Sequence, residues 1–159
     1  MSKAVLDCSV IVALSSLGYL DNLKDVFEEI MVPQAVYEEI CTKGRGLPGD
    51  RELRDLADRE AIGIRNVRNR VLVNALLDPL SLGEAEALAL AVEEEAECVV
   101  IDDRLARSRA KAMGLKVIGT LRILRLFLDA GLISKKNYEH WNFPVSHVWV
   151  KGFKVETAK

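Results

Sequence analysis

The chain has 159 residues, of which 50% are hydrophobic and 29% are charged, and its formal net charge is −2. This balance is typical of one globular domain with a hydrophobic core and excludes an intrinsically disordered chain. No apolar run reaches the roughly 20 residues of a membrane-spanning helix, and Asp7 interrupts the apolar segment that a signal peptide would need. We therefore expect a soluble, cytoplasmic protein. Because the chain is not basic overall, a nucleic acid would have to bind a local patch or bound metal ions.

The cysteines and histidines match no metal-binding or catalytic pattern. Cys8, Cys41 and Cys98 are far apart and lack CxxC spacing, so we interpret them as small buried thiols. His140 and His147 form no HExxH motif, which argues against histidine-based acid–base catalysis.

Short apolar segments alternate with helical patterns along the chain. Apolar spacing, helix-starting residues and glycine-rich breaks indicate where each element begins and ends. In chain order we expect a strand at 3–7, a buried helix at 9–18 capped by Ser9, a helix at 21–30, a short apolar segment at 30–32, a helix at 33–41, a loop at 43–50, a helix at 51–61, a strand at 62–67, a helix at 80–96, a strand at 97–101, a helix at 102–114, a strand at 115–119 and a helix at 120–133.

The helix at 80–96 has the clearest pattern. Ser81 followed by Glu84 matches a capping box, and the predicted buried stripe consists of Ala85, Leu88, Ala89 and Val92. Alternating strands and helices predict an α/β fold with a mostly parallel sheet and helices on both faces. We expect a single domain over 1–159, in which 134–159 is a C-terminal extension with a further helix and a short strand at 147–155.

Acidic residues follow the predicted strands directly. Asp7 follows the first strand, and Asp102 and Asp103 follow the strand at 97–101. In parallel sheets, ligands bind at the carboxyl ends of the strands, so these acids should lie at one functional edge. Glu84 is a candidate for the same edge, as is either Glu38 or Glu39.

Each of these acids, taken alone, also has a structural interpretation. Glu84 could serve only as a capping-box residue, and Glu38 and Glu39 could belong to a solvated helix face. The aspartates could cap the helices that follow them.

Taken together, the acids favour a metal site. Four or five carboxylates in one crevice would repel one another strongly, and a hard divalent cation would relieve the repulsion. Carboxylate oxygens suit Mg²⁺ or Mn²⁺, which also bind phosphate oxygens and activate water. This combination suggests metal-dependent hydrolysis of phosphodiesters.

Five segments, in order, resemble the PIN-domain nucleases, and most closely their prokaryotic branch. The segments are LDCSVIVAL, VPQAVYEEI, LGEAEALALA, VVIDDRLARSRAKAMGLKVIGT and LRILRLFLDAGLI, and they extend from about residue 4 to about residue 133. The resemblance implies a PIN-like three-layer α/β/α sandwich. It also implies a Mg²⁺- or Mn²⁺-dependent ribonuclease that acts on single-stranded RNA, is often a homodimer, and is in many cases the toxin paired with an antitoxin protein.

The resemblance also assigns the site residues. The family's four acids fall on Asp7, Glu39, Glu84 and Asp103, and Asp102 is a possible further ligand. The spacing from Val36 selects Glu39 over Glu38, and position 84 is a glutamate where many members carry aspartate.

Basic residues could hold the RNA. Arg65, Arg68 and Arg70 are close together in sequence, and a second group surrounds the helix at 102–114. Arg104 and Arg107 would share a helix face near the acids and contact phosphates, together with Ser9. Alternatively, they could form a solvated face that pairs with the glutamates at 93–95, and Arg104 could neutralise Asp103.

Other functions also fit parts of the sequence. A non-catalytic PIN-like module could bind RNA or a protein through its arginines and through Trp141, Phe143 and Trp149, although core packing is the default role of these aromatic residues. A phosphatase with an aspartyl nucleophile normally carries a second aspartate two residues after the first, whereas position 9 is serine.

Overall fold

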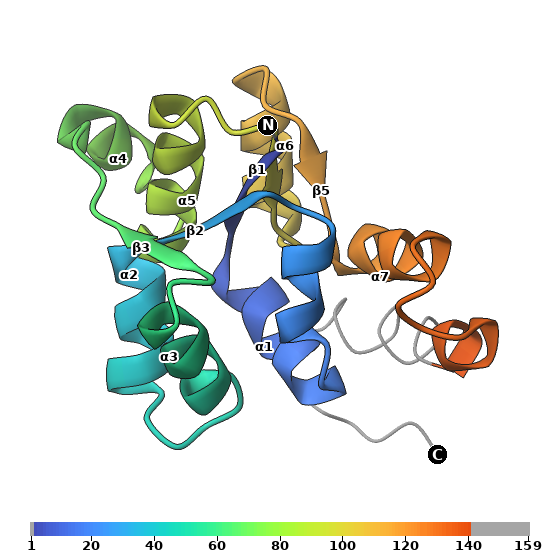
Figure 1. The fold of residues 1–159 in the computed structure, drawn as a ribbon. Helices are drawn as coiled ribbons and strands as arrows, with labels where there is room; N and C mark the ends of the chain where they lie inside the picture. The colour runs from blue at the N-terminus through green and yellow to red at the C-terminus, as the bar shows by residue number, and fades with distance from the viewer. Residues whose placement is uncertain (1, 141–159) are drawn as a thin grey trace, which may run out of the picture.

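The computed structural model describes residues 2–140 of the chain, which form a parallel sheet covered by helices on both faces (Figure 1). Every strand pairing in the sheet is parallel, and the strand order is β3-β2-β1-β4-β5. The strands are β1 (Lys3–Leu6), β2 (Glu29–Pro33), β3 (Gly63–Arg65), β4 (Cys98–Val100) and β5 (Val117–Ile118).

Each strand is followed by one or more helices. They are α1 (Cys8–Leu17), the 3₁₀-helix η1 (Leu20–Asp25), α2 (Gln34–Tyr37), the π-helix η2 (Glu38–Lys43), α3 (Asp50–Asp58), α4 (Arg70–Leu76), α5 (Leu82–Glu93), α6 (Arg104–Ala112) and α7 (Thr120–Asp129). The turn after α6 contains Gly114 at a φ of 79°, a left-handed conformation that glycine adopts without strain.

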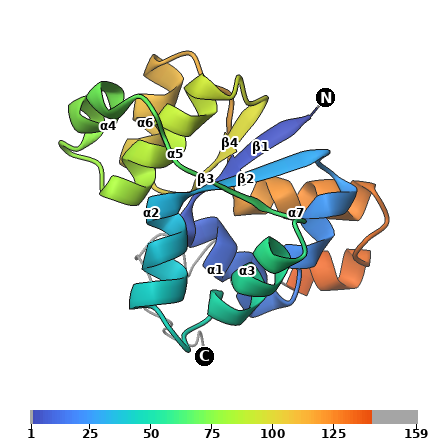
Figure 2. The same cartoon turned by 60° about the vertical axis from the view of Figure 1, so that its left-hand side comes forward.

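Alternate residues of the central strands point into two separate cores. Ala4, Leu6 and Val100 pack with residues of α1, α3 and α7, whereas Val5 and Val99 pack with α4, α5 and α6. Figure 2 shows these two groups of helices on opposite sides of the sheet. The predicted α/β/α sandwich is therefore confirmed.

The predicted helix at 21–30 is wrong in its second half. The 3₁₀-helix ends at Asp25, and Glu29, Ile30 and Met31 pair with β1. The apolar spacing that suggested one helix arises because a short 3₁₀-helix and a strand both place residues in the core. Pairing with β1 and β3 decides the conformation of 29–33, and this long-range effect overrides the local pattern.

Three further details differ from the expectations. Asp7, not Ser9, occupies the position before α1. Val92, predicted to be buried, is 43% exposed. The buried residues of α5 do not form one stripe, because alanines on several sides of the helix are buried around Leu88. Helix α4 was not predicted, although its start signal is present in the sequence: the Asn69 side chain accepts a hydrogen bond from the Leu72 N–H, and Val73 and Leu76 are buried.

None of the helices in the described part of the chain combines the length and apolar character that a bilayer crossing requires. The predicted strand at 147–155 and the aromatic residues Trp141, Phe143 and Trp149 lie outside the described residues.

Candidate active site

Four acids lie at the carboxyl edge of the sheet, each on a different segment. Asp7 follows β1, Asp103 precedes α6 after β4, Glu39 lies on η2 after β2, and Glu84 lies in the first turn of α5. They lie near enough for Glu84 to raise the pKa of Asp7, and for Asp103 and Glu39 to raise the pKa of Glu84. The fold therefore brings these four predicted site residues close enough for the charge of one to shift the pKa of another.

Asp7 is a buried acid whose side chain makes no capping hydrogen bond. It occupies the N-cap position of α1 and is 4% exposed, and the Ser9 hydroxyl donates to its Oδ2 at 3.2 Å. Burial is the largest cause that raises the pKa of Asp7 to about 7; the backbone of Cys8 opposes the shift, and the charge of Glu84 adds to it. Helix capping therefore does not account for this buried carboxylate.

Glu84 forms the predicted capping box and also lies beside other acids. Its Oε2 accepts from the Ser81 N–H at 3.0 Å, while the Ser81 hydroxyl accepts from the Glu84 N–H, which completes the predicted capping box. Burial is the largest cause that raises the pKa of Glu84, and the neighbouring charges of Asp103 and Glu39 add to it. The capping contact thus holds a carboxylate that also faces other acids.

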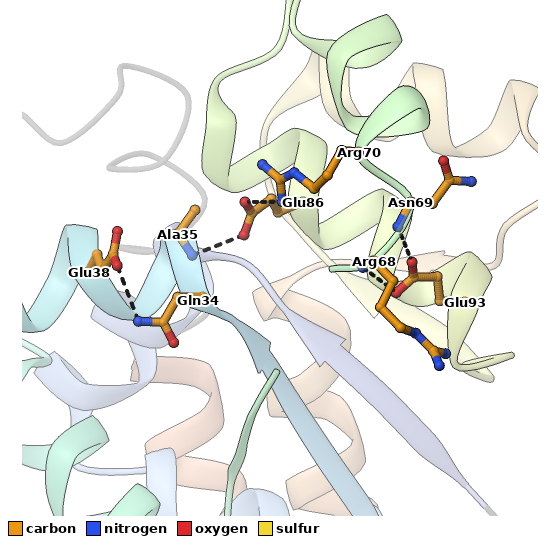
Figure 3. A network of polar contacts seen from close by, with 8 residues as sticks. All are labelled: Gln34, Ala35, Glu38, Arg68, Asn69, Arg70, Glu86 and Glu93. Atoms are coloured by element: carbon orange, nitrogen blue, oxygen red, sulfur yellow. Dashed lines mark hydrogen bonds and ion pairs between the residues drawn. The ribbon is translucent and has the colours of Figure 1, made fainter. Parts of the chain in front are cut away.

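Glu39, not Glu38, faces the other acids. A Cβ atom added at Gly83 would lie 3.1 Å from Oε2 of Glu39, so the glycine lets η2 approach the start of α5 closely. Glu39 also raises the pKa of the half-buried Cys8 thiol, after the larger effect of burial. Both glutamates are exposed, but Oε1 of Glu38 accepts from Nε2 of Gln34 at 3.2 Å (Figure 3).

The adjacent aspartates after β4 have different partners. Oδ2 of Asp103 accepts from the Ala106 N–H at 2.9 Å, which caps α6. Asp102 instead accepts from the N–H of buried Thr120 at 2.8 Å and from its hydroxyl at 2.6 Å. Asp102 therefore connects the end of β4 to the start of α7, and its role as a further metal ligand stays a prediction.

The donors are hard oxygen atoms, which suit Mg²⁺ or Mn²⁺. Within residues 2–140, however, no three Asp, Glu, His or Cys side chains are gathered closely enough to hold a metal ion. The donor chemistry fits a divalent cation, and the buried carboxylate of Asp7 would gain most from one. The carboxylates would have to move closer together to coordinate it.

The residues predicted to contact RNA lie near these acids. Ser9 bonds to Asp7, and Nη1 of Arg107 donates to the Ile101 carbonyl at 3.0 Å. Within residues 2–140, neither Arg104 nor Arg107 forms an ion pair, so Arg104 does not neutralise Asp103 in this way. Nor do the two arginines pair with the glutamates at 93–95.

The sequence did not single out Glu86, a buried acid two residues after Glu84. Its Oε1 accepts from the Ala35 N–H at 3.0 Å, and its Oε2 accepts from Nη1 of Arg70 at 2.9 Å (Figure 3). Glu86 thus connects α5 to the first turn of α2. Glu84 lies on α5, and Glu39 lies on η2, which directly follows α2. The motif Gly-Glu-Ala-Glu contains this acid, but its partners come from distant parts of the chain.

Replacing Glu86 with alanine should lower the free energy of unfolding by about 2 kcal/mol, because two hydrogen bonds of a buried carboxylate are lost. Urea unfolding at pH 7 would measure the change. Glu94→Ala is the matched control, because Glu94 lies at the end of the same helix and makes no side-chain hydrogen bond or ion pair within residues 2–140. Equal losses in the two variants would contradict a structural role for Glu86.

Comparison with known proteins supports the fold. The chain matches a PIN-domain family model, DUF3368, over residues 3–141. No curated protein matches it. A PilT N-terminus domain protein, SSO1118 from the hyperthermophilic archaeon Sulfolobus solfataricus, is 19% identical with a TM-score of 0.50, and the match covers 79% of this chain and 93% of that one. A domain of a functionally unknown protein from Methanocaldococcus jannaschii is 22% identical with a TM-score of 0.45, and that match covers 75% and 91%.

The Sulfolobus structure, at 19% identity, bears on the fold alone. The family match extends over most of the chain, and its range contains all four predicted site acids. The chain therefore belongs to the PIN-domain family.

Proposed function

We propose that this protein is a metal-dependent ribonuclease that cleaves phosphodiester bonds of single-stranded RNA. PIN domains are generally nucleases, and the family generally uses divalent metal ions. The observation that carries the proposal is the buried, uncapped carboxylate of Asp7 beside three acids from other segments.

Asp7, Glu39, Glu84 and Asp103 would hold Mg²⁺ or Mn²⁺. When bound, such an ion lowers the pKa of a water molecule and stabilises charge on the phosphate and the leaving oxygen. The buried position of Asp7 keeps water away from its carboxylate and so strengthens its attraction for a cation. The hydrogen bonds from Ser9 to Asp7 and from Ser81 to Glu84 orient these two carboxylates before substrate arrives.

RNA cleavage by the purified protein tests this proposal. We expect cleavage of a labelled single-stranded RNA with Mn²⁺ or Mg²⁺, and no cleavage with EDTA. A duplex of the same sequence serves as the control for single-strand preference. Cleavage in EDTA, or its absence with every divalent ion tested, would overturn the proposal.

A second candidate is a non-catalytic PIN-like module that binds RNA or a protein. The lack of a ready-made metal cluster within residues 2–140 is the observation that favours it. It predicts that Mn²⁺ leaves the thermal stability unchanged and that partner binding survives replacement of the acids.

The toxin role, an antitoxin partner and a homodimer remain predictions from the family resemblance. Expression in a bacterial host would test the first of them. A ribonuclease toxin should arrest growth, and Asp7→Asn should relieve the arrest.

A further inference from the structure

We propose that a pocket along α6 binds the phosphates of the RNA strand outside the bond that is cleaved; this inference rests on the proposed function. The pocket has a volume of about 410 Å³ and is lined by Asp102, Arg104, Arg107, Ser108 and Lys111. The four lining residues on α6 recur at the spacing of one helix face. The pocket thus runs along the helix whose first end carries Asp103.

The charges of the pocket favour an anion. Within residues 2–140, Arg104, Arg107 and Lys111 form no ion pair, so their charges are not neutralised by neighbouring acids. Among the described residues, Asp102 is the one acid that lines this pocket, and both its oxygens accept hydrogen bonds from Thr120. The pocket therefore contains three positively charged side chains and one carboxylate, whose oxygens already accept hydrogen bonds.

Arg107 is held in place before any ligand binds. Its Nη1 donates to the Ile101 carbonyl at 3.0 Å, and a Cβ atom added at Gly119 would lie 2.7 Å from the same nitrogen. The glycine thus leaves the space that the guanidinium occupies. Because arginine has further N–H groups in the same plane, an anchored guanidinium can still donate to a phosphate.

The extent of the pocket favours a strand over a free phosphate ion. Arg104 and Lys111 are about 10 Å apart along the helix axis, which is more than one phosphate covers. Lys111 also lies about 12 Å along the axis from Asp103. The far end of the pocket therefore contacts RNA away from the acids and contributes to binding rather than to the chemical step.

RNA binding without cleavage tests this inference. A labelled single-stranded RNA would be titrated with the whole protein in EDTA at several salt concentrations, and with the variants Lys111→Ala and Lys116→Ala. Lys116 is the matched control, because it follows the same helix but pairs with Glu97 at 3.6 Å. We expect Lys111→Ala to weaken binding about fivefold and to reduce the slope of log K against log salt by about 0.7, as for one lost phosphate contact on a single strand. Lys116→Ala should stay within about twofold of wild type.

Further measurements separate this inference from the proposed function. With Mn²⁺, Lys111→Ala should raise KM and leave kcat unchanged. Inorganic phosphate at millimolar concentration should not displace the RNA, and displacement would indicate a site for a single anion instead.

Equal binding of RNA by the Lys111→Ala and Lys116→Ala proteins would overturn the proposed pocket, even if the wild-type protein cleaves RNA. If Lys111→Ala loses RNA binding but the wild-type protein cleaves no RNA, the proposed RNA-binding pocket is supported and the proposed ribonuclease function is overturned. Unchanged unfolding temperatures would show that the variants are folded.

Discussion

Replacing Asp7 with asparagine is expected to stabilise the metal-free protein above pH 7. The pKa of Asp7 is about 7 in the folded chain, compared with an ordinary value of 3.8. Between these two values the folded state keeps a proton that the unfolded state releases, so stability falls as the pH rises through this window. The full shift corresponds to about 4 kcal/mol at 1.36 kcal/mol per pKa unit, and the neutral asparagine avoids this cost.

Urea unfolding in EDTA at pH 4, 6 and 8 would measure this difference between wild type and variant. The advantage of Asp7→Asn should be largest at pH 8 and should shrink towards pH 4. Asp21→Asn is the control with the opposite sign, because a hydrogen bond from Lys24 lowers the pKa of exposed Asp21. Asp21 therefore contributes stability that is present above pH 4 and is lost as the pH falls. A stability difference for Asp7→Asn that does not change with pH would contradict the burial argument.

The same Asp7→Asn variant is expected to lose at least about 100-fold in kcat for RNA cleavage with Mn²⁺, because a neutral amide holds a cation far less well than a carboxylate. Since the substitution should stabilise the metal-free fold, unfolding would not explain the loss. The stability and activity effects of one substitution thus have opposite directions, as is common where a charge is buried for function.

The adjacent glutamates provide a matched pair for the second acid. Glu39→Gln should lower kcat by about the same factor as Asp7→Asn. Glu38→Gln should leave kcat within about twofold, because the Glu38 carboxylate bonds to Gln34. If the two variants lose activity equally, Glu39 is not the specific ligand.

The sequence was sufficient for the layered fold and for the edge at which the acids gather. Parallel strands direct their carboxyl ends to one side, so Asp7 and Asp103 could be placed from strand ends alone. Residues 29–33 could not be placed from local spacing, because pairing with β1 and β3 decides their conformation. The hydrogen-bond partners of Asp102 and Asp103 could not be told apart either, because Asp102 bonds to Thr120, which is 18 residues away in sequence.

Glu86 shows a different limit of sequence patterns. Its position two residues after Glu84, on a helix with other glutamates, does not by itself indicate a buried residue. Its importance comes from burial beside Ala35 and Arg70, and the chain assembles these contacts only when α2, α4 and α5 pack together.

Calorimetric titration of Mn²⁺ into the protein at pH 7.5, for wild type and Asp7→Asn, tests the proposed metal site most directly. We expect Mn²⁺ to bind wild type, with release of protons because the pKa of Asp7 is about 7 in the metal-free protein. Binding should weaken at least about tenfold in Asp7→Asn. Equal Mn²⁺ affinity in the two proteins, or no Mn²⁺ binding by wild type, would contradict a divalent-cation site built around Asp7.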